Sequence, residues 1–302
     1  MDSQRAIAAR RLSAAGDYVQ LWQEPESCTA FLLQLTFPPT RLQRAQSLAS
    51  LNCAELDLVH VDARRDDETD RARAAGNLKA IADAEASTSP CIAHVRTHLA
   101  TGDPAPCIAE IAERHDVDLI LLGAHHKAGW KEHLLPTVAE QLLRLTHRPV
   151  LVVRRPSDAP YHRLLVAVAD GVLAQSTLDL ALAVTSLDEI VAVHAFVPDL
   201  RNRILAGGDV SRIWRDQQEA LESTLQGFAA RNPQLRFSTN AIAVVGDTGD
   251  VLRQAEQDFS PDLTVIVTHA LRGLARALHG SIADTLIEAG EHDLLLQATA
   301  AD

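Results

Sequence analysis

The chain has 302 residues, of which 47% are hydrophobic and 23% charged, and its formal net charge is −12 at pH 7. This size and apolar content suffice for two ordinary domains. The negative charge argues against a nucleic-acid-binding protein, because such proteins are usually basic. No apolar run approaches the roughly 18 residues of a membrane span, and the N-terminus lacks the apolar centre of a signal peptide. We therefore expect a globular, cytoplasmic protein with neither nucleic acid nor membrane as a partner.

The first half alternates short apolar runs with amphipathic segments. The runs predict strands, and they are FLLQLT (31–36), ELDLVHV (55–61), CIAHVRTHL (91–99), DLILLG (118–123) and PVLVVR (149–154). Helical patterns lie between them, among them PAPCIAEIAERH (104–115) and TVAEQLLRLTH (137–147).

The second half repeats this order. Its predicted strands are RLLVAVA (163–169), EIVAVHAF (189–196), LRFSTNAIAVV (235–245), DLTVIVT (262–268) and DLLLQAT (293–299), with a long helix over 214–230. A shift of 144 residues places Asp118 on Asp262 and His125 on His269, and the offset is about 133 near Leu32. Such self-similarity indicates an internal repeat.

Strand and helix alternation of this kind predicts parallel sheets with helices on both faces. We expect an α/β protein made of two tandem, open, five-stranded parallel sheets. Asp103 and Asp247 each follow a glycine and precede a helical pattern. A carboxylate in that position can accept hydrogen bonds from free N–H groups, so both are predicted to be helix caps.

The domain boundaries follow from the repeat. Residues 1–30 have no counterpart in the second half and form a predicted N-terminal extension. The polar segment RRPSDAPYHR (154–163) contains two prolines and separates the halves. We therefore predict a first domain over 31–156, a linker over 157–160 and a second domain over 161–302.

The stretch THALRGLARALHGSIADTLI (268–287) is similar to the glycine loop and following helix of the universal stress protein family. Both halves resemble that domain, over 31–156 and 161–302, and the chain resembles the tandem, UspE-like form. The resemblance implies a Rossmann-like fold of the adenine nucleotide alpha hydrolase type and a stress-response role. Nucleotide-binding members carry G-x-x-G, nine residues, then Gly and Ser or Thr, with an Asp ending the first strand.

In the first half the four glycine-loop positions hold Gly123, His126, Pro136 and Thr137, and the strand-one position holds Thr36. Backbone N–H groups bind phosphate at a helix N-terminus only when side chains allow the approach, and proline has no N–H. The first-half phosphate turn is therefore predicted to be degenerate.

In the second half the four positions hold Val267, Ala270, Gly280 and Ser281, and Ala169 replaces the strand-one Asp. Half of the pattern survives there. The candidate binding residues for a weak nucleotide pocket, with ATP as its ligand, are Thr268, His269, Gly273, Gly280 and Ser281, and Arg272 or Arg276 would supply positive charge. No cofactor is required under this interpretation.

Other chemistry has less support. A zinc site could draw on His125, His126 and His133, together with Cys91 and His94, but their spacing is poor for one ion. His94, Arg96 and His98 share one strand face, which we interpret as a partly exposed face.

The sequence contains no G-x-S-x-G, H-E-x-x-H or P-loop motif. We expect a non-enzymatic protein that binds a partner or small ligand. The alternatives are a slowly hydrolysing ATP switch that uses the second half and a zinc-binding module.

Single-domain members of the family commonly dimerise through their last strands. The resemblance therefore implies that Val150–Val153 and Leu294–Gln297 pair antiparallel within the chain, which would give a pseudo-two-fold pseudo-dimer and remove two exposed sheet edges. This pairing leaves the other faces of the chain free to form a homo-oligomer.

Overall fold

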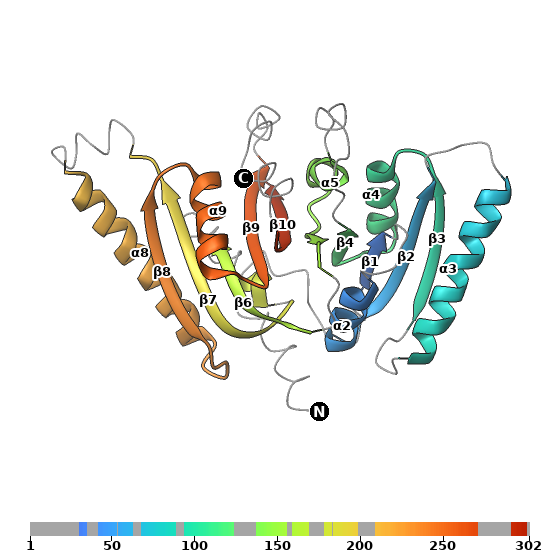
Figure 1. Ribbon diagram of the computed structural model, residues 1–302, viewed down its shortest axis with the longest axis horizontal. Helices are drawn as coiled ribbons and strands as arrows, with labels where there is room; N and C mark the ends of the chain where they lie inside the picture. The colour runs from blue at the N-terminus through green and yellow to red at the C-terminus, as the bar shows by residue number, and fades with distance from the viewer. Residues whose placement is uncertain are drawn as a thin grey trace. The chain divides into compact units, whose positions relative to one another are not determined.

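The computed structural model describes residues 30–34, 42–52, 54–62, 68–88, 94–123, 137–155, 159–168, 178–182, 184–198, 209–270 and 291–300. The chain forms two compact units (Figure 1), here called unit 1 (residues 1–160 and 296–302) and unit 2 (residues 161–295). The first break between them follows Pro160, the last residue of the predicted linker.

Unit 1 alternates strands with helices in chain order. These are β1 (Ala30–Gln34), α2 (Leu42–Asn52), β2 (Glu55–Asp62), α3 (Glu68–Thr88), β3 (Val95–Thr101), α4 (Pro104–Arg114), β4 (Leu119–Gly123), α5 (Val138–Leu145) and β5 (Val150–Val153). The strand order is β3-β2-β1-β4-β5, and every pairing is parallel. The order reverses between β1 and β4. Right-handed crossovers then place α2 and α3 on one face of the sheet and α4 and α5 on the other.

Unit 2 repeats the arrangement. Its elements are β6 (Tyr161–Ala167), β7 (Thr185–Phe196), α8 (Val210–Arg231), β8 (Ser238–Val245), α9 (Thr248–Phe259) and β9 (Leu263–Ala270), and β10 (Asp293–Ala300) begins in it. The order is β10-β9-β6-β7-β8, and β6 pairs in parallel with β7 and β9, as β7 does with β8. The predicted α/β class with tandem parallel sheets and helices is confirmed.

The core explains why the strands appear in the sequence as unbroken apolar runs. All four residues of β5, and Leu119 to Leu122 of β4, are buried. Central strands of a parallel sheet are covered on both faces, so they need apolar side chains in both directions. In unit 2 the hydroxyl of Tyr161, which starts β6, donates a 2.6 Å hydrogen bond to the buried Asp293.

Two predictions fall outside what the structure describes. Residues 1–29 of the predicted N-terminal extension are outside the described ranges. The expected pairing of Val150–Val153 with Leu294–Gln297 concerns the placement of one unit against the other, and it stays a prediction.

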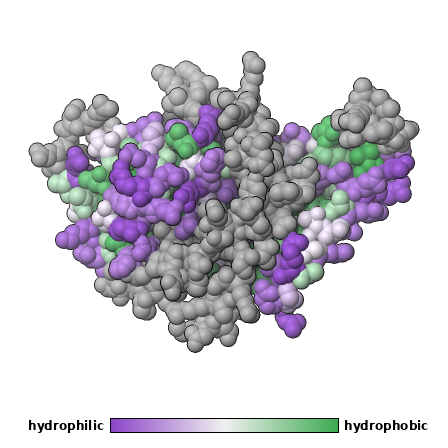
Figure 2. Space-filling model, turned by 180° about the vertical axis from the view of Figure 1, so that it is seen from behind, coloured by the Kyte–Doolittle hydropathy of each residue, from purple (hydrophilic) through white to green (hydrophobic). Residues whose placement is uncertain are grey.

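The exposed apolar side chains are unevenly divided. Within the described ranges, the large exposed ones are Leu51 and Leu145 in unit 1 and Val197, Val210, Trp214, Ile242 and Val245 in unit 2. On the face seen in Figure 2, hydrophobic residues (green) interrupt a hydrophilic surface (purple). Of the helices in the described ranges, none combines the length and the apolar character needed to cross a bilayer.

The two aspartates predicted to be helix caps differ. The Asp247 carboxylate accepts two N–H hydrogen bonds from the first turn of α9, at 2.9 and 3.2 Å, which confirms this cap. Asp103 holds the same position before α4, but its side chain makes no capping hydrogen bond, so that prediction was wrong. Pro104 and Pro106 occupy the first turn there, and neither has an N–H to donate.

We expect Asp247→Ala to lower the free energy of unfolding of unit 2 by about 1 kcal/mol, because two N–H groups lose their acceptor. Asp103→Ala, at the matching position in unit 1, should change the free energy of unfolding by less than about 0.5 kcal/mol. Urea unfolding of the full chain, followed by circular dichroism, measures both. Equal losses in the two variants would contradict this assignment of the caps.

Candidate functional site

The turn predicted to have lost phosphate binding in unit 1 connects β4 to α5. Gly123 ends β4 and Thr137 caps α5, whereas His126 and Pro136 lie outside the described residues. The Thr137 hydroxyl accepts a hydrogen bond from the Glu140 N–H (3.2 Å), and Glu140 Oε2 accepts one from the Thr137 N–H (2.7 Å). This reciprocal capping box satisfies two N–H groups that a phosphate would otherwise use.

Glu140 also brings a negative charge to this helix end. Glu140 is only 8% exposed. The N-terminus of a helix attracts anions through its free N–H groups and its dipole. A phosphate would therefore have to displace this carboxylate or lie beside it, where like charges repel. The Glu140 carboxylate therefore already lies where an anionic ligand would bind at the N-terminus of α5.

The five residues predicted for the nucleotide pocket of unit 2 are only partly described. Thr268 and His269 lie near the carboxyl end of β9, while Gly273, Gly280 and Ser281 lie outside the described residues. β9 pairs with β6, and the strand order reverses between them. Ligands of open parallel sheets bind at such a reversal. The pocket stays a prediction, with two of its residues placed.

Of the five residues considered for the alternative zinc site, only His94 lies within the described ranges. Cys91, His125, His126 and His133 lie outside the described ranges, and His94 is an exposed residue directly before β3.

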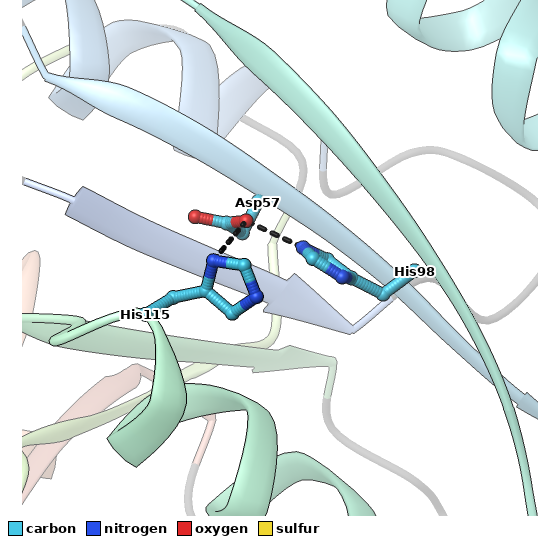
Figure 3. Close-up of side chains that lie close together, drawn as sticks. All are labelled: Asp57, His98 and His115. Carbon is cyan, nitrogen blue, oxygen red and sulfur yellow. Dashed lines mark hydrogen bonds and ion pairs between the residues drawn. The ribbon is translucent and has the colours of Figure 1, made fainter.

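A polar cluster lies elsewhere in unit 1, where no site is predicted from the sequence. Asp57 lies in β2, and its side chain is 0% exposed. Arg96 of β3 is its partner in the strand register, and His98, two residues further along β3, lies on the same face of the sheet. His115, which follows α4, completes the group around the carboxylate (Figure 3).

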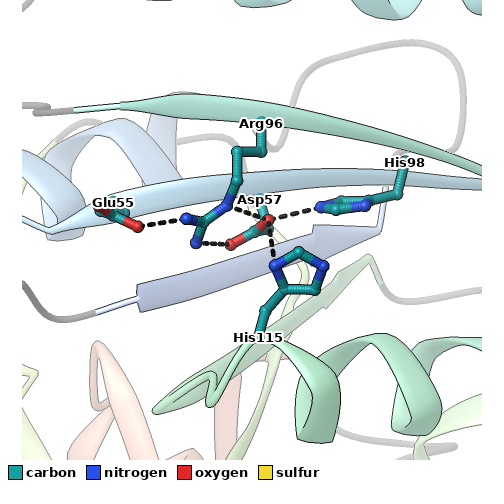
Figure 4. Close-up of polar contacts among 5 residues, drawn as sticks. All are labelled: Glu55, Asp57, Arg96, His98 and His115. Atoms are coloured by element: carbon teal, nitrogen blue, oxygen red, sulfur yellow. Dashed lines mark hydrogen bonds and ion pairs between the residues drawn. The ribbon is translucent and has the colours of Figure 1, made fainter.

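Arg96 binds both carboxylate oxygens of Asp57, with Nε 2.9 Å from Oδ1 and Nη2 2.8 Å from Oδ2. His98 Nε2 lies 2.5 Å from Oδ1, and His115 Nδ1 lies 3.9 Å from the same atom. Arg96 also reaches Glu55, at 2.6 Å. We call these five residues the Asp57 network (Figure 4).

Both the strand pattern and the burial explain the network. A carboxylate on a strand that is buried on both faces needs hydrogen-bonding partners. The prediction that His94, Arg96 and His98 share one strand face is confirmed for Arg96 and His98, which both contact Asp57, whereas His94 lies before the start of β3. Their side chains are 37% and 18% exposed, so the strand face is partly open to solvent.

The network shifts the pKa values of Asp57, Arg96 and His115. Burial alone would raise the pKa of Asp57, but hydrogen bonds from Arg96 and His98 outweigh burial and lower it to about 2. The hydrogen bond to Asp57 raises the pKa of Arg96. Burial lowers the pKa of His115 against the attraction of Asp57. At neutral pH, Asp57 and Arg96 are therefore charged and His115 is neutral.

The network contains groups that can bind metals. Asp57, His98 and His115 offer ligand atoms that all lie within 4.8 Å of one another, and carboxylate and imidazole are zinc ligands. Arg96, however, binds both oxygens of Asp57, so an ion there would lie beside a fixed positive charge. We therefore interpret the network as an ion-pair arrangement that joins β2, β3 and the end of α4.

Asp57 and His115 were missed from the sequence for different reasons. Asp57 is a carboxylate between two leucines of the predicted strand ELDLVHV, and this anomaly could have indicated a buried ion pair. The position of His115 depends on how α4 crosses the sheet, which no local pattern specifies.

The network also lies near the amino end of β2, whereas the predicted phosphate turn follows the carboxyl end of β4.

Both units match one family model, that of the Universal stress protein family, over residues 40–154 and 160–296. The chain belongs to the universal stress protein family. Two matches in succession also show that it carries two family domains in tandem.

Similar proteins share this assignment. A universal stress protein of Mycobacterium tuberculosis is 26% identical over 204 residues, which cover 65% of this chain and 66% of that protein, so just under two thirds of the relative is matched. One of Methanocaldococcus jannaschii is 42% identical over 62 residues, 20% of this chain and 36% of that protein. A universal stress protein structure from Archaeoglobus fulgidus has a TM-score of 0.63 at 16% identity, covering 89% of this chain and 96% of that one, and shows the same fold.

We expect the Asp57 carboxylate to contribute stability that is lost in acid. Its pKa in the folded chain is about 2, below the ordinary 3.8. The contribution, about 2 kcal/mol, is therefore present above about pH 4 and disappears as the pH falls toward 2. The lowered pKa of His115 also reduces stability in acid, because this imidazole takes up its proton at a higher pH in the unfolded chain than in the folded one.

Urea unfolding of the wild type and Asp57→Asn between pH 6 and pH 3 measures this contribution. The difference in free energy of unfolding should be largest at pH 6 and should shrink toward pH 3. Asp216→Asn, at an exposed position of α8, serves as the control and should match the wild type at each pH. A difference that does not vary with pH would show that Asp57 has an ordinary pKa.

Proposed function

We propose that this protein is a cytoplasmic, UspE-like tandem universal stress protein that acts without catalysis by binding a partner or small ligand. In this proposal, the phosphate turn of the first domain is degenerate and the second domain holds at best a weak nucleotide pocket. The capping box of Thr137 and Glu140 is the observation that carries the proposal.

The first-domain argument rests on occupied donors. Thr137 stands where nucleotide-binding members have the Ser or Thr that enters the helix, and Pro136 stands where they have the preceding glycine. Thr137 donates its N–H to Glu140 and accepts from the Glu140 N–H. The residue before them has no N–H to offer. These changes leave few donors for a phosphate in the first domain.

The second-domain argument rests on lost and retained residues. Gly280 and Ser281 keep the helix-entry pair of the family pattern, but Val267 and Ala270 replace its first two glycines. Charge-assisted contacts are worth about 1.5–3 kcal/mol each, so the loss of glycine approaches weakens a nucleotide site considerably. Ser281 and Asp284 also have the spacing of a capping box, which would place a carboxylate at that helix end as well.

Calorimetric titration of the full chain with ATP and Mg²⁺ tests the proposal. We expect binding no tighter than roughly 10 μM. Any weak binding should be abolished by Gly280→Val, because a Cβ blocks the backbone approach, and should be kept by Gly123→Ala at the matched turn of the first domain.

Low-micromolar binding that Gly280→Val abolishes, together with slow ATP turnover, would replace this proposal by the ATP switch. Tight binding that only Gly123→Ala removes would show instead that the first-domain turn is functional.

A further inference from the structure

Unit 2 has a counterpart of the Asp57 network in which Asp57 and its three contacts are replaced by uncharged side chains, whereas Glu55 corresponds to the charged Glu189. The strand registers equate Asp57 with Val191. Asp57 lies opposite a residue of β1, and Val191 lies opposite the residue of β6 that the repeat offset of about 133 matches to it. Arg96, which lies opposite Asp57, therefore corresponds to Asn240, which lies opposite Val191. The carboxylate and its guanidinium partner are both replaced.

The two imidazoles are replaced as well. A shift of 144 residues, the offset of the repeat in this part of the chain, places His98 on Ile242 and His115 on Phe259. Each charged or titratable group that contacts Asp57 in unit 1 is thus matched by an amide or an apolar side chain in unit 2.

These residues line an open groove in unit 2. It lies between α9 and the β7–β8 part of the sheet, and its volume is about 580 Å³. Val191 and Val193, at 4% and 2% exposed, form its floor, and Ile242 is 37% exposed beside them. Phe259 lies at the end of α9. A mostly apolar cleft of this size is typical of small-molecule sites.

The rim of the groove is acidic. Asp247, Asp250 and Asp258 all line it. Of these, Asp250 forms an ion pair with Arg253, while Gln254 donates a 2.9 Å hydrogen bond to Asp258. The rim therefore keeps more negative than positive charge.

One further arginine approaches the groove without altering this balance. Arg163 lies over the Phe259 ring, with its guanidinium carbon 4.3 Å from the ring centroid. Its charge is matched by Glu189, whose Oε2 lies 3.3 Å from its Nε. Arg163 therefore already forms a cation–π contact with one face of this ring.

We propose that this groove of unit 2 binds a small organic cation with an apolar, aromatic body. The body would cover the two floor valines and Ile242, and the positive charge would lie against the aspartates of the rim. In unit 1 the corresponding space holds the guanidinium and imidazole groups of the protein itself. The site lies along β7 and β8 rather than at the end of β9, so it is independent of the proposed nucleotide pocket.

Tetraphenylphosphonium and tetraphenylborate are the probes that test this proposal, because they match in size and shape and differ in charge. Calorimetric titration of the full chain should show one phosphonium site, with affinity at least about tenfold higher than for the borate. Equal affinities, a preference for the borate, or no phosphonium binding would overturn the proposal.

Two sets of variants locate the site. Ile242→Lys should weaken phosphonium binding at least about tenfold, because it adds a positive charge inside the groove. Leu51→Lys makes the same kind of change at an exposed residue of α2 and should leave the affinity unaltered. Ile242→Ala, which adds no charge and shortens the side chain, should weaken binding less. An equal loss in Ile242→Lys and Leu51→Lys would place the ion elsewhere and overturn the assignment.

The double variant Asp250→Asn with Asp258→Asn tests the rim. It should remove most of the preference for phosphonium over borate, while Asp216→Asn on α8 should keep it. A preference that survives in the double variant contradicts the role of the rim. Added ATP and Mg²⁺ should leave phosphonium binding unchanged, so this result and the nucleotide titration can fail separately.

Discussion

Each unit depends on a parallel sheet whose central strands are covered on both faces. The hydrogen-bonded registers of these strands fix which side chains become neighbours, and the helices that cover them exclude water. A polar side chain on such a strand needs a partner close by, since a buried charge without one is costly. Polar or ligand-binding residues therefore lie in two regions. One is the carboxyl ends of the strands, and the other is the strip of sheet beside α4 (β2 and β3) or beside α9 (β7 and β8).

The two units use that strip in different ways. In unit 1, the desolvated carboxylate of Asp57 is compensated by the two-point contact of Arg96 and by His98. In unit 2, Val191 and Ile242 need no such compensation, and a groove remains between the sheet and α9. The internal repeat therefore offers a comparison within one chain. Equivalent backbone positions carry charged and imidazole side chains in unit 1 and line an open groove in unit 2.

In unit 1, a side chain of the protein also caps the helix that follows the carboxyl end of β4. Phosphate binding at a helix N-terminus requires free N–H groups and no competing anion. Glu140 supplies an anion from within α5 and takes the Thr137 N–H, so the helix is stabilised by its own side chain. This capping is the physical basis of the proposal that the first-domain turn no longer binds phosphate.

The sequence by itself determined the strand and helix alternation, the internal repeat, the family resemblance and the cap at Asp247, because each depends on residues close together in the chain or on a fixed offset. It also showed which glycines of the family's nucleotide-binding pattern are absent. Only the tertiary structure decided that Asp57 meets Arg96 and His98, which are 39 and 41 residues away, and that Val191 and Ile242 form a groove. Periodicity assigns a side chain to a face of a strand, but the register and the helix crossing decide what it meets there.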